Sequence, residues 1–404
     1  MVPEGWKQVE MREVCEKIAV GLAISVTPYM RESGVKLIRN QNIKRNCFND
    51  TSVVFIDKAF AEKNKNKKVR MSDVVAVRTG SNIGEACVVP KGFDGALTFT
   101  TLIARPRREK IDSIYLSTHI NSEKGIAEVH RLSAGGGKPN LNSGELKKYR
   151  LLLPPLPEQI KIASILSTWD RSITTTEKLL ANTHQQKKAF LQQLLTGKKR
   201  LLDENGVRFR EKWQEYSLGA LFSERVDTGK SDLPLLSITA GQGVVYQEET
   251  GRKNTSNTDK SKYRRICVND IGYNTMRMWQ GRSSLSDKEG LVSPAYTILI
   301  PSDKVVPQYA GYLFKLPQLI NVFYRHSQGL VSDTWNLKYN HFKKIDWSFP
   351  SKKEQKKIAE RIHQADQNIE LIEKRLIKLK QEKRALMQQL LSGKRRVKVG
   401  EAAV

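Results

Sequence analysis

The sequence predicts an α+β protein in which two mixed α/β globular domains are separated by two long helices that pair as an antiparallel coiled coil. The first observation is a repeat, because residues 154–200 align without a gap to residues 350–396 and 21 of the 47 aligned pairs are identical. The second is that apolar residues recur in both copies at alternating steps of four and three, which is typical of coiled coils. We therefore expect a first globular domain at residues 1–152, a spacer helix at 153–202, a second globular domain at 203–349, a second spacer helix at 350–397 and a tail at 398–404.

The second repeat has the stronger apolar seam. Nine of its ten seam positions are apolar, and they are Ile358, Ile362, Ala365, Ile369, Ile372, Leu376, Leu379, Lys383, Leu386 and Leu390. The first repeat has two threonines in the same register, at Ile162, Leu166, Trp169, Ile173, Thr176, Leu180, Thr183, Lys187, Phe190 and Leu194. Both repeats place a lysine at the same step, and a single polar residue in a seam can fix the register.

The ends of both repeats carry helix signals. Ser351 and Glu354 have the spacing of a capping box, and Gly197 and Gly393 lie where a left-handed residue ends a helix. Each helix of roughly 40 residues would be about 60 Å long. Two unrelated surface helices are the alternative, but the globular domain between the repeats lets the second helix return antiparallel to the first.

The globular domains contain short apolar runs bounded by Gly, Asn, Asp and Pro, which indicate strands and loops. Residues 73–78 and 295–300 are the clearest strands, and short helices are expected around residues 111–119 and 309–316.

The charge indicates a polyanionic partner, since 69 basic and 42 acidic residues give a net charge of +27 over 404 residues. We expect no membrane segment, because no apolar run approaches about 18 residues, and no signal peptide. The four cysteines and six histidines are scattered, so we expect a reducing cytoplasm and no metal site.

Two polar segments of the first domain are suited to contact a polynucleotide. Residues 78–82 follow a predicted strand, and residues 133–142 form a glycine-rich loop whose backbone can approach phosphates closely. The spacing of a Walker A loop is absent, and a plain surface turn is the alternative. The candidate residues are Arg78, Thr79, Ser81, Asn82, Gly136, Gly137, Lys138 and Asn140.

In the second domain, residues 274–282 combine hydrogen-bond donors, arginines and an aromatic side chain, and Arg and Gln can read guanine and adenine edges. Residues 332–338 occupy the place equivalent to the glycine-rich loop, just before the second spacer helix. Trp279 and Trp335 fit core positions equally well. The candidate residues are Gln242, Arg277, Gln280, Arg282, Ser332, Trp335 and Lys338.

With these features the chain resembles the specificity subunit of type I restriction-modification systems. The resemblance is carried by PEGW at residues 3–6, Trp213 followed by LGAL at 218–221, DVVAVRTGSNIG at 73–84 and PPLPEQ at 154–159. The second repeat departs from the last motif, because residues 350–355 read PSKKEQ. The resemblance covers essentially the whole chain and depends on the arrangement of its parts as much as on these motifs.

The resemblance implies that each globular domain is a target-recognition domain that reads one half of an asymmetric, bipartite double-stranded DNA target. It implies that the paired helices are a spacer and a docking surface for two methyltransferase subunits, which carry S-adenosylmethionine and methylate adenine at N6. Restriction subunits would join the complex in a prokaryotic cytoplasm, and this chain would have no active site or cofactor. The candidate partner-binding residues are the repeated Glu158, Gln159, Gln192, Gln193, Glu354, Gln355, Gln388 and Gln389.

Two other functions compete with this interpretation. A nuclease could be proposed from Asp94, Glu145 and Lys147, but three such residues arise easily by chance in a chain that is 27% charged. A sequence-independent DNA-binding scaffold would also be basic, and RNA is a further possible ligand. The ratio of specific to non-specific affinity separates a sequence-specific protein from a scaffold.

Overall fold

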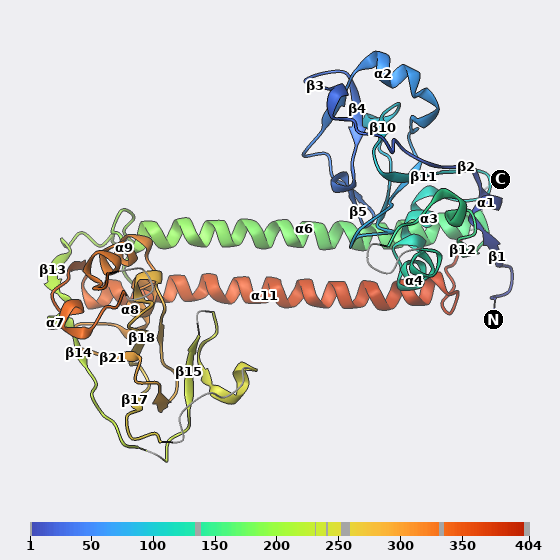
Figure 1. Ribbon diagram of the computed structural model, residues 1–404. Coiled ribbons are helices and arrows are strands. Elements are labelled where there is room, and N and C mark those ends of the chain that lie inside the picture. The colour runs from blue at the N-terminus through green and yellow to red at the C-terminus, as the bar shows by residue number, and fades with distance from the viewer. Residues whose placement is uncertain are drawn as a thin grey trace. The chain divides into compact units, whose positions relative to one another are not determined.

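The computed structural model describes residues 2–133, 139–230, 232–239, 241–251, 259–330 and 335–399. The chain divides into two compact units, of which unit 1 comprises Met1–Lys178 with Lys374–Val404 and unit 2 comprises Leu179–Glu373. Two long helices, α6 (Leu156–Leu195) and α11 (Lys352–Leu391), each contribute one half to either unit (Figure 1). Each unit therefore consists of a globular domain and two half-helices.

The globular part of unit 1 is a mixture of strands and short helices. Its helices are α1 (Met11–Val14), α2 (Lys58–Lys63), α3 (Ser113–Ile120), α4 (Glu123–Leu132) and α5 (Ser143–Leu146). Its strands are β1 (Lys7–Glu10), β2 (Cys15–Val20), β3 (Met30–Arg31), β4 (Val35–Ile38), β5 (Ile43–Lys44), β6 (Cys47–Phe48), β7 (Val54–Ile56), β8 (Val74–Val77), β9 (Ala86–Val88), β10 (Leu97–Thr98), β11 (Thr101–Pro106) and β12 (Arg150–Leu153). The central antiparallel sheet has the order β2-β11-β8-β9, and β1 pairs with β12 next to the start of α6.

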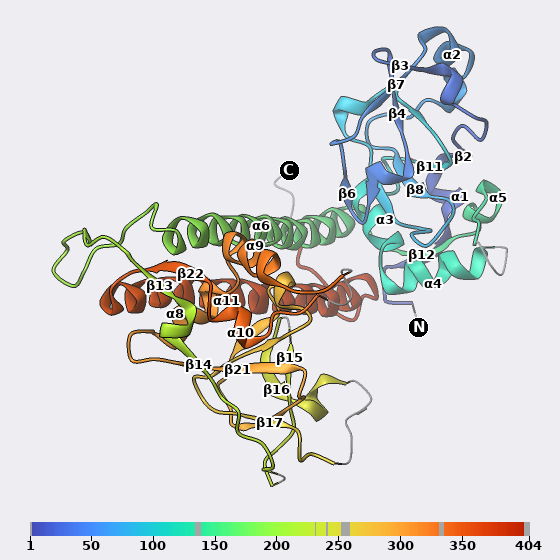
Figure 2. The same cartoon turned by 60° about the vertical axis from the view of Figure 1, so that its left-hand side comes forward.

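Unit 2 has its own set of elements. Its helices are α7 (Leu218–Leu221), α8 (Pro307–Leu313), α9 (Pro317–His326) and α10 (Tyr339–Phe342). Its strands are β13 (Gln214–Ser217), β14 (Phe222–Glu224), β15 (Leu236–Thr239), β16 (Gly243–Tyr246), β17 (Arg264–Ile266), β18 (Ile271–Asn274), β19 (Ser283–Leu285), β20 (Gly290–Val292), β21 (Tyr296–Pro301) and β22 (Asp346–Phe349). The hairpin of β15 and β16 and the pair of β17 and β20 extend away from the helices α8 to α10 (Figure 2).

The two globular domains share a framework that their sequences conceal. The sheet β14-β21-β18-β19 of unit 2 repeats the order β2-β11-β8-β9 of unit 1, and β13 pairs with β22 as β1 pairs with β12. In unit 1 the helices α3 and α4 follow β11, and α5 precedes the last strand, β12. In unit 2 the helices α8 and α9 follow β21 in the same way, and α10 precedes β22. The predicted strands and short helices are confirmed as β8, β21, α3 and α8, with small shifts of their ends.

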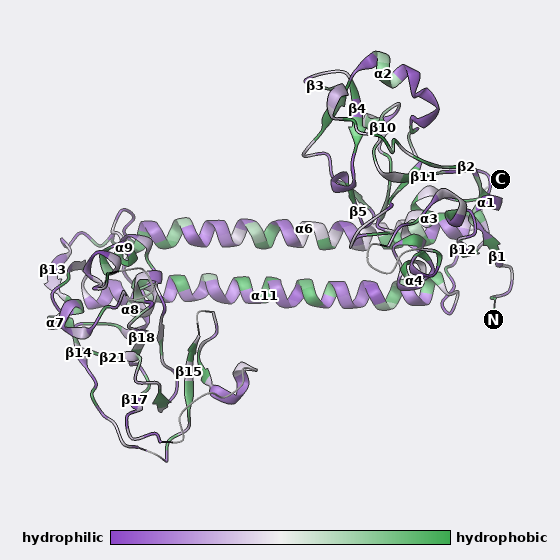
Figure 3. Ribbon diagram, viewed as in Figure 1, coloured by the Kyte–Doolittle hydropathy of each residue, from purple (hydrophilic) through white to green (hydrophobic). Residues whose placement is uncertain are grey.

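The predicted pairing of the helices is confirmed within each unit, where the halves of α6 and α11 run antiparallel. In unit 1, Asp170 of α6 pairs with Lys383 of α11, and Glu177 pairs with Lys380 at 2.7 Å. In unit 2, the seam lysine Lys187 pairs with Asp366. Both seam lysines are therefore neutralised by an aspartate at the same repeat position. Figure 3 shows apolar residues recurring along both helices among polar ones.

Each globular domain is joined to its half-helices by one continuous core. In unit 1, Ile162 and Leu166 of α6 and Leu390 of α11 pack with Trp6 and Tyr115. In unit 2, the equivalent residues Ile358 and Ile362 of α11 and Leu194 of α6 pack with Phe222, Tyr309 and other buried aromatic residues. Because burial of such side chains contributes about 1.5–3 kcal/mol each, the domain and the helices form one folding unit.

A cluster of Trp, Glu and Arg, which we call the clamp, is repeated in both units. It joins the start of one long helix to the residues that follow the end of the other and to a Trp near the start of the globular domain. In unit 1, the Glu158 carboxylate accepts hydrogen bonds from Arg396 at 2.7 and 2.8 Å and from the indole N–H of Trp6 at 3.0 Å. In unit 2, Glu354 accepts two bonds of 2.7 Å from Arg200 and one of 3.2 Å from Trp213. The carboxylate expected to complete a capping box is thus bound by an arginine and a tryptophan.

The glycines predicted to end the helices have the expected conformation, with φ of +70° at Gly197 and +67° at Gly393. A Cβ at Gly197 would lie 3.3 Å from the ring of Trp213, and one at Gly393 would lie 2.4 Å from Pro3. Glycine is required here both for the left-handed turn and for the close approach of the domain.

Two kinds of feature are absent from the residues that the structure describes. None of the helices there is long and apolar enough to cross a membrane. The same residues contain no group of three His, Cys, Asp or Glu side chains that could hold a metal ion.

Candidate nucleic-acid interface

The first candidate interface is the loop that follows β8, residues 78–84. Gly84 donates to the carbonyl of Val77 at 2.9 Å and Ile83 is buried, so both ends of the loop are fixed. Thr79, Ser81 and Asn82 are exposed between these anchors. Their hydroxyl and amide groups are therefore presented to solvent on a rigid support.

The structure brings Asn140, from the second predicted segment of this domain, to this loop. Arg78 donates from Nε to Oδ1 of Asn140 at 3.1 Å, and Thr79 forms an isolated β-bridge with Asn140. Leu141, which is fully buried, donates its N–H to the carbonyl of Arg78. The Arg78 guanidinium is therefore oriented by Asn140. Three other candidates, Gly136, Gly137 and Lys138, lie outside the described residues.

The second candidate interface is the equivalent loop of unit 2, residues 275–281 after β18. Leu337 donates to the carbonyl of Thr275 at 2.8 Å, which matches the bond from Leu141 to Arg78 in unit 1. The loop ends at Gly281 with φ of +73°, as the first loop ends at Gly84 with φ of +82°. These bonds give Leu337, of the predicted segment 332–338, the same place in its domain as Leu141 of the glycine-rich segment 133–142.

The second loop presents larger side chains than the first. Arg277, Gln280 and Arg282 are exposed, and Lys338 is exposed at the start of α10. Trp335 is half-buried with its ring 5.3 Å from that of Trp279, so the two predicted tryptophans meet at the surface. Gln242 lies elsewhere, in the turn of the β15–β16 hairpin, and Ser332 is outside the described residues.

The partner-binding candidates fall into two groups. Glu158, Gln159, Glu354 and Gln355 are buried and are bound by residues of this chain. Gln159 accepts from the N–H of Asp112 and donates to the carbonyls of Lys110 and Pro154, and Gln355 makes the same three bonds to Val306, Lys304 and Pro350. The other group, Gln192, Gln193, Gln388 and Gln389, is exposed, and within it Gln388 donates to the carboxylate of Glu123.

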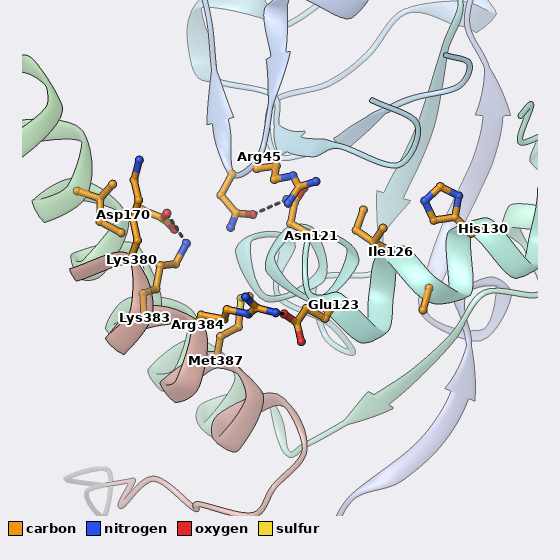
Figure 4. A pocket seen from close by; sticks show the side chains of 13 residues that line it. Arg45, Asn121, Glu123, Ile126, His130, Asp170, Lys380, Lys383, Arg384 and Met387 are labelled. Atoms are coloured by element: carbon orange, nitrogen blue, oxygen red, sulfur yellow. Dashed lines mark hydrogen bonds and ion pairs between the residues drawn. The ribbon is translucent and has the colours of Figure 1, made fainter. Parts of the chain in front are cut away.

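Each unit has a cavity beside its half-helices. In unit 1 a cavity of about 810 Å³ lies between α4 and the end of α11, and Figure 4 shows Arg384 turned toward Glu123 and Lys383 toward Asp170. In unit 2 a cavity of about 750 Å³ is lined by the equivalent Lys187, Lys188 and Asp366, together with residues of α8. Equivalent residues of the repeat line both cavities, whereas the residues that the globular domains contribute are different.

A common framework that exposes unlike loops, together with a repeated pair of helices, defines a recognition protein with two non-identical binding domains. The sequence matches the family described as the type I restriction modification DNA specificity domain at residues 3–183 and 210–381. The chain belongs to this family, and the match includes both globular domains.

Known proteins of similar sequence and structure agree with this assignment. The putative type I restriction enzyme MjaX specificity subunit of Methanocaldococcus jannaschii is 23% identical over 430 residues, which cover 98% of this chain and 95% of the relative. The type I restriction enzyme MjaVIII specificity subunit of the same organism is 24% identical over 83% of this chain and 82% of the relative. The S subunit of a type I restriction-modification system from M. genitalium has a similar fold, with a TM-score of 0.57 at 14% identity over 96% of each chain.

These comparisons confirm the predicted specificity subunit and its DNA-binding, non-catalytic class. Sequence reasoning missed the clamp and the internal bonds of Gln159 and Gln355. The repeated Glu–Gln pair was a signal for them, but nothing in the sequence indicated the side chains that it meets.

Proposed function

We propose that this chain is the sequence-specific DNA-binding subunit of a type I restriction-modification complex and reads an asymmetric, bipartite target. The observation that carries the proposal is the contrast between the domains and the helices. The two domains share the order of one four-stranded sheet and the pairing of their first and last strands, but they present different loops. The half-helices, in contrast, repeat the same contacts in both units. Identical heads related by a two-fold axis would read a palindrome, so unlike heads fit two different half-sites.

The proposed partners are two copies of an adenine-N6 methyltransferase subunit, which bring S-adenosylmethionine to the complex. Restriction subunits join the same complex in the cytoplasm. The repeat supports two copies of one partner, because each unit offers equivalent surface residues. By contrast, unrelated partners would have no reason to select the same residues on both helices.

The proposed partner surface is a narrow stripe on the side of each helix opposite the seam, and part of it borders cavities beside the globular domains. It consists of Gln185, Ala189, Gln192 and Gln193 on α6 and the identical Gln381, Ala385, Gln388 and Gln389 on α11. All eight are exposed, and the first three of each set lie within about 60° of one another at 100° per residue, on the side opposite the seam. Exposed neighbours differ between the copies, as Asn182 and Lys378 do. Gln388 also donates to Glu123 of α4, but this contact belongs to one copy and does not explain why the stripe is repeated, whereas a common partner does.

The first experiment is to co-express the chain with a methyltransferase subunit encoded beside it and to map methylated adenines across the host DNA. The expected result is one split motif, with two short specific blocks separated by a fixed gap. Methylation in a single continuous motif would contradict the reading of two half-sites. Complex formation without methylation would favour the alternative of a sequence-independent scaffold.

The stripe is tested by the stoichiometry of the complex. The double variant Ala189→Glu with Gln192→Glu is expected to lose one methyltransferase copy in native mass spectrometry, because it places two carboxylates on one of the two surfaces. The pair Ala385→Glu with Gln389→Glu on α11 should lose the other copy, and it leaves Gln388 free to donate to Glu123. Gln186→Glu is the control, since it adds a carboxylate at an exposed position where the second repeat already has Glu382. Two bound copies in both double variants would refute this surface.

A further inference from the structure

Three aromatic side chains from separate segments of unit 2 meet at its surface. The ring of Trp335 lies 4.9 Å from that of Tyr324 and 5.3 Å from that of Trp279, and all three pairs pack edge to face. Trp279 belongs to the loop after β18, Tyr324 to α9 and Trp335 to the segment before α10. Met276, which is 45% exposed, lies in the same loop as Trp279. We call these four residues the aromatic surface.

The aromatic surface is not required to fill the core. Beneath it, Phe314, Phe323 and Phe342 are fully buried and pack on one another. Phe323 and Tyr324 are neighbours on α9, yet the first is fully buried and the second is 42% exposed. Large aromatic side chains contribute most when they are covered, so a partly exposed cluster above a complete core indicates a binding surface.

The charge around the aromatic surface selects a nucleic acid as its ligand. Residues 275–282, 317–326 and 335–344, which carry it, contain no Asp or Glu. The nearby Glu224 is paired with Arg264, and Asp333 lies outside the described residues. The three segments contain six Lys and Arg residues, and all six are exposed: Arg277, Arg282, Arg325, Lys338, Lys343 and Lys344. A polyanion with apolar groups between its charges complements such a surface, and DNA has phosphates on the outside and bases in its grooves.

The hydrogen bonding of Trp279 limits what its ring can contribute. Its indole N–H donates to the carbonyl of Met276 at 3.0 Å, and this is the only donor of the side chain. The ring can therefore offer apolar contact and cannot at the same time donate to a base edge. Because the three rings pack on one another, they form a broad face and no single projecting wedge, which favours contact along a groove over insertion between base pairs.

The aromatic surface lies at a position of the common framework that has polar side chains in unit 1. The loop of Trp279 corresponds to the loop of unit 1 that exposes Thr79, Ser81 and Asn82, whose hydroxyl and amide groups are hydrogen-bonding groups. One framework thus presents polar groups in the first domain, and in the second it presents aromatic and thioether groups beside Arg277, Gln280 and Arg282. The only apolar group that distinguishes bases in the major groove is the thymine methyl.

We propose that the second recognition domain reads its half-site through contact of the aromatic surface with thymine methyl groups, while the surrounding arginines bind phosphates. This inference rests on the proposed function, because it takes double-stranded DNA as the ligand of the domain. Its half-site accordingly contains thymines at the contacted positions. The first domain reads the other half-site by hydrogen bonds.

The test uses the complete complex of this chain with its methyltransferase subunits and duplexes that contain the split motif. Replacing thymine by deoxyuridine in the half-site of the second domain removes only the methyl groups, and we expect about a tenfold loss of affinity. The same replacement in the other half-site is the matched control and should change affinity by less than about twofold. Equal effects in both half-sites, or none in either, would overturn the inference.

Variants separate apolar contact from contact with phosphates. Met276→Ala and Trp279→Ala should each weaken specific binding about tenfold and leave the slope of log affinity against log salt unchanged, because they release no counterions. Arg277→Ala should reduce that slope by about one. Met276 is exposed, so its variant tests the contact even if Trp279→Ala does not fold. A reduced slope for Met276→Ala would refute the inference, whereas a wild-type complex without a split motif would refute the proposed function itself.

Discussion

Replacing Gln355 by alanine should destabilise unit 2, because one buried amide satisfies three backbone groups. Its Oε1 accepts from the N–H of Val306 at 2.9 Å, and its Nε2 donates to the carbonyls of Lys304 and Pro350 at 3.0 Å each. Gln355 is 1% exposed, so water does not readily replace these bonds. At about 1 kcal/mol for each lost bond, the expected loss is about 3 kcal/mol. For a domain of this size, that corresponds to a fall in Tm of about 6–12 °C.

The assay is thermal unfolding of the full chain, with hydrogen exchange measured by mass spectrometry to assign the effect to a unit. Exchange should accelerate around Val306 and α8 in the variant, while unit 1 keeps the protection of the wild type. Gln192→Ala is the matched control, since it removes the same side chain from an exposed position of the repeat and should change stability by less than about 0.5 kcal/mol. A loss below about 1 kcal/mol for Gln355→Ala, or equal losses in the two variants, would refute the reasoning.

Three further predictions concern titratable groups. Burial lowers the pKa of His119 to about 4. The free energy of unfolding should therefore be highest above about pH 6.5, the pKa of an unfolded His, and should fall as pH falls toward 4. His119→Gln should remove this dependence when unfolding is measured at a series of pH values. Burial raises the pKa of the Cys15 thiol to about 12, so iodoacetamide at pH 8 should modify the exposed Cys47 and spare Cys15, as read by peptide mass spectrometry. A double-mutant cycle of Lys383→Met and Asp170→Asn should give a coupling of about 1 kcal/mol that declines with added salt, because the pair is partly exposed, and a zero coupling would contradict its role in the seam.

The helices were predictable from sequence because their signals are local and periodic. The seam positions, the terminal glycines and the offset between repeats all lie within short stretches of chain, and the structure confirms them in α6 and α11. The seam lysines were also visible. Their partners were not, because Asp170 and Asp366 lie beside the seam positions and meet the lysines only across the antiparallel pair.

The shared framework of the globular domains could not be predicted, because strands of three to six residues carry little sequence information and pair across long separations. Only the openings of the two domains align by sequence, whereas the sheets have the same order of strands. The polar loop was found in the first domain because it follows an apolar strand. The aromatic surface escaped detection because Tyr324 reaches it from another segment, and a lone tryptophan fits a core as well as a surface.

The arrangement of each unit explains why the same residues recur on both helices. The core of the first domain is completed by Leu390 and Leu391, and its clamp by Arg396, all from the far end of the chain. The second domain uses Leu194, Leu195 and Arg200 in the same way. Each helix therefore has to support one domain with its start and the other with its end. A substitution at a repeated core position consequently changes the support of one domain and leaves the other intact, so the two domains can diverge in what they bind while the helices remain alike.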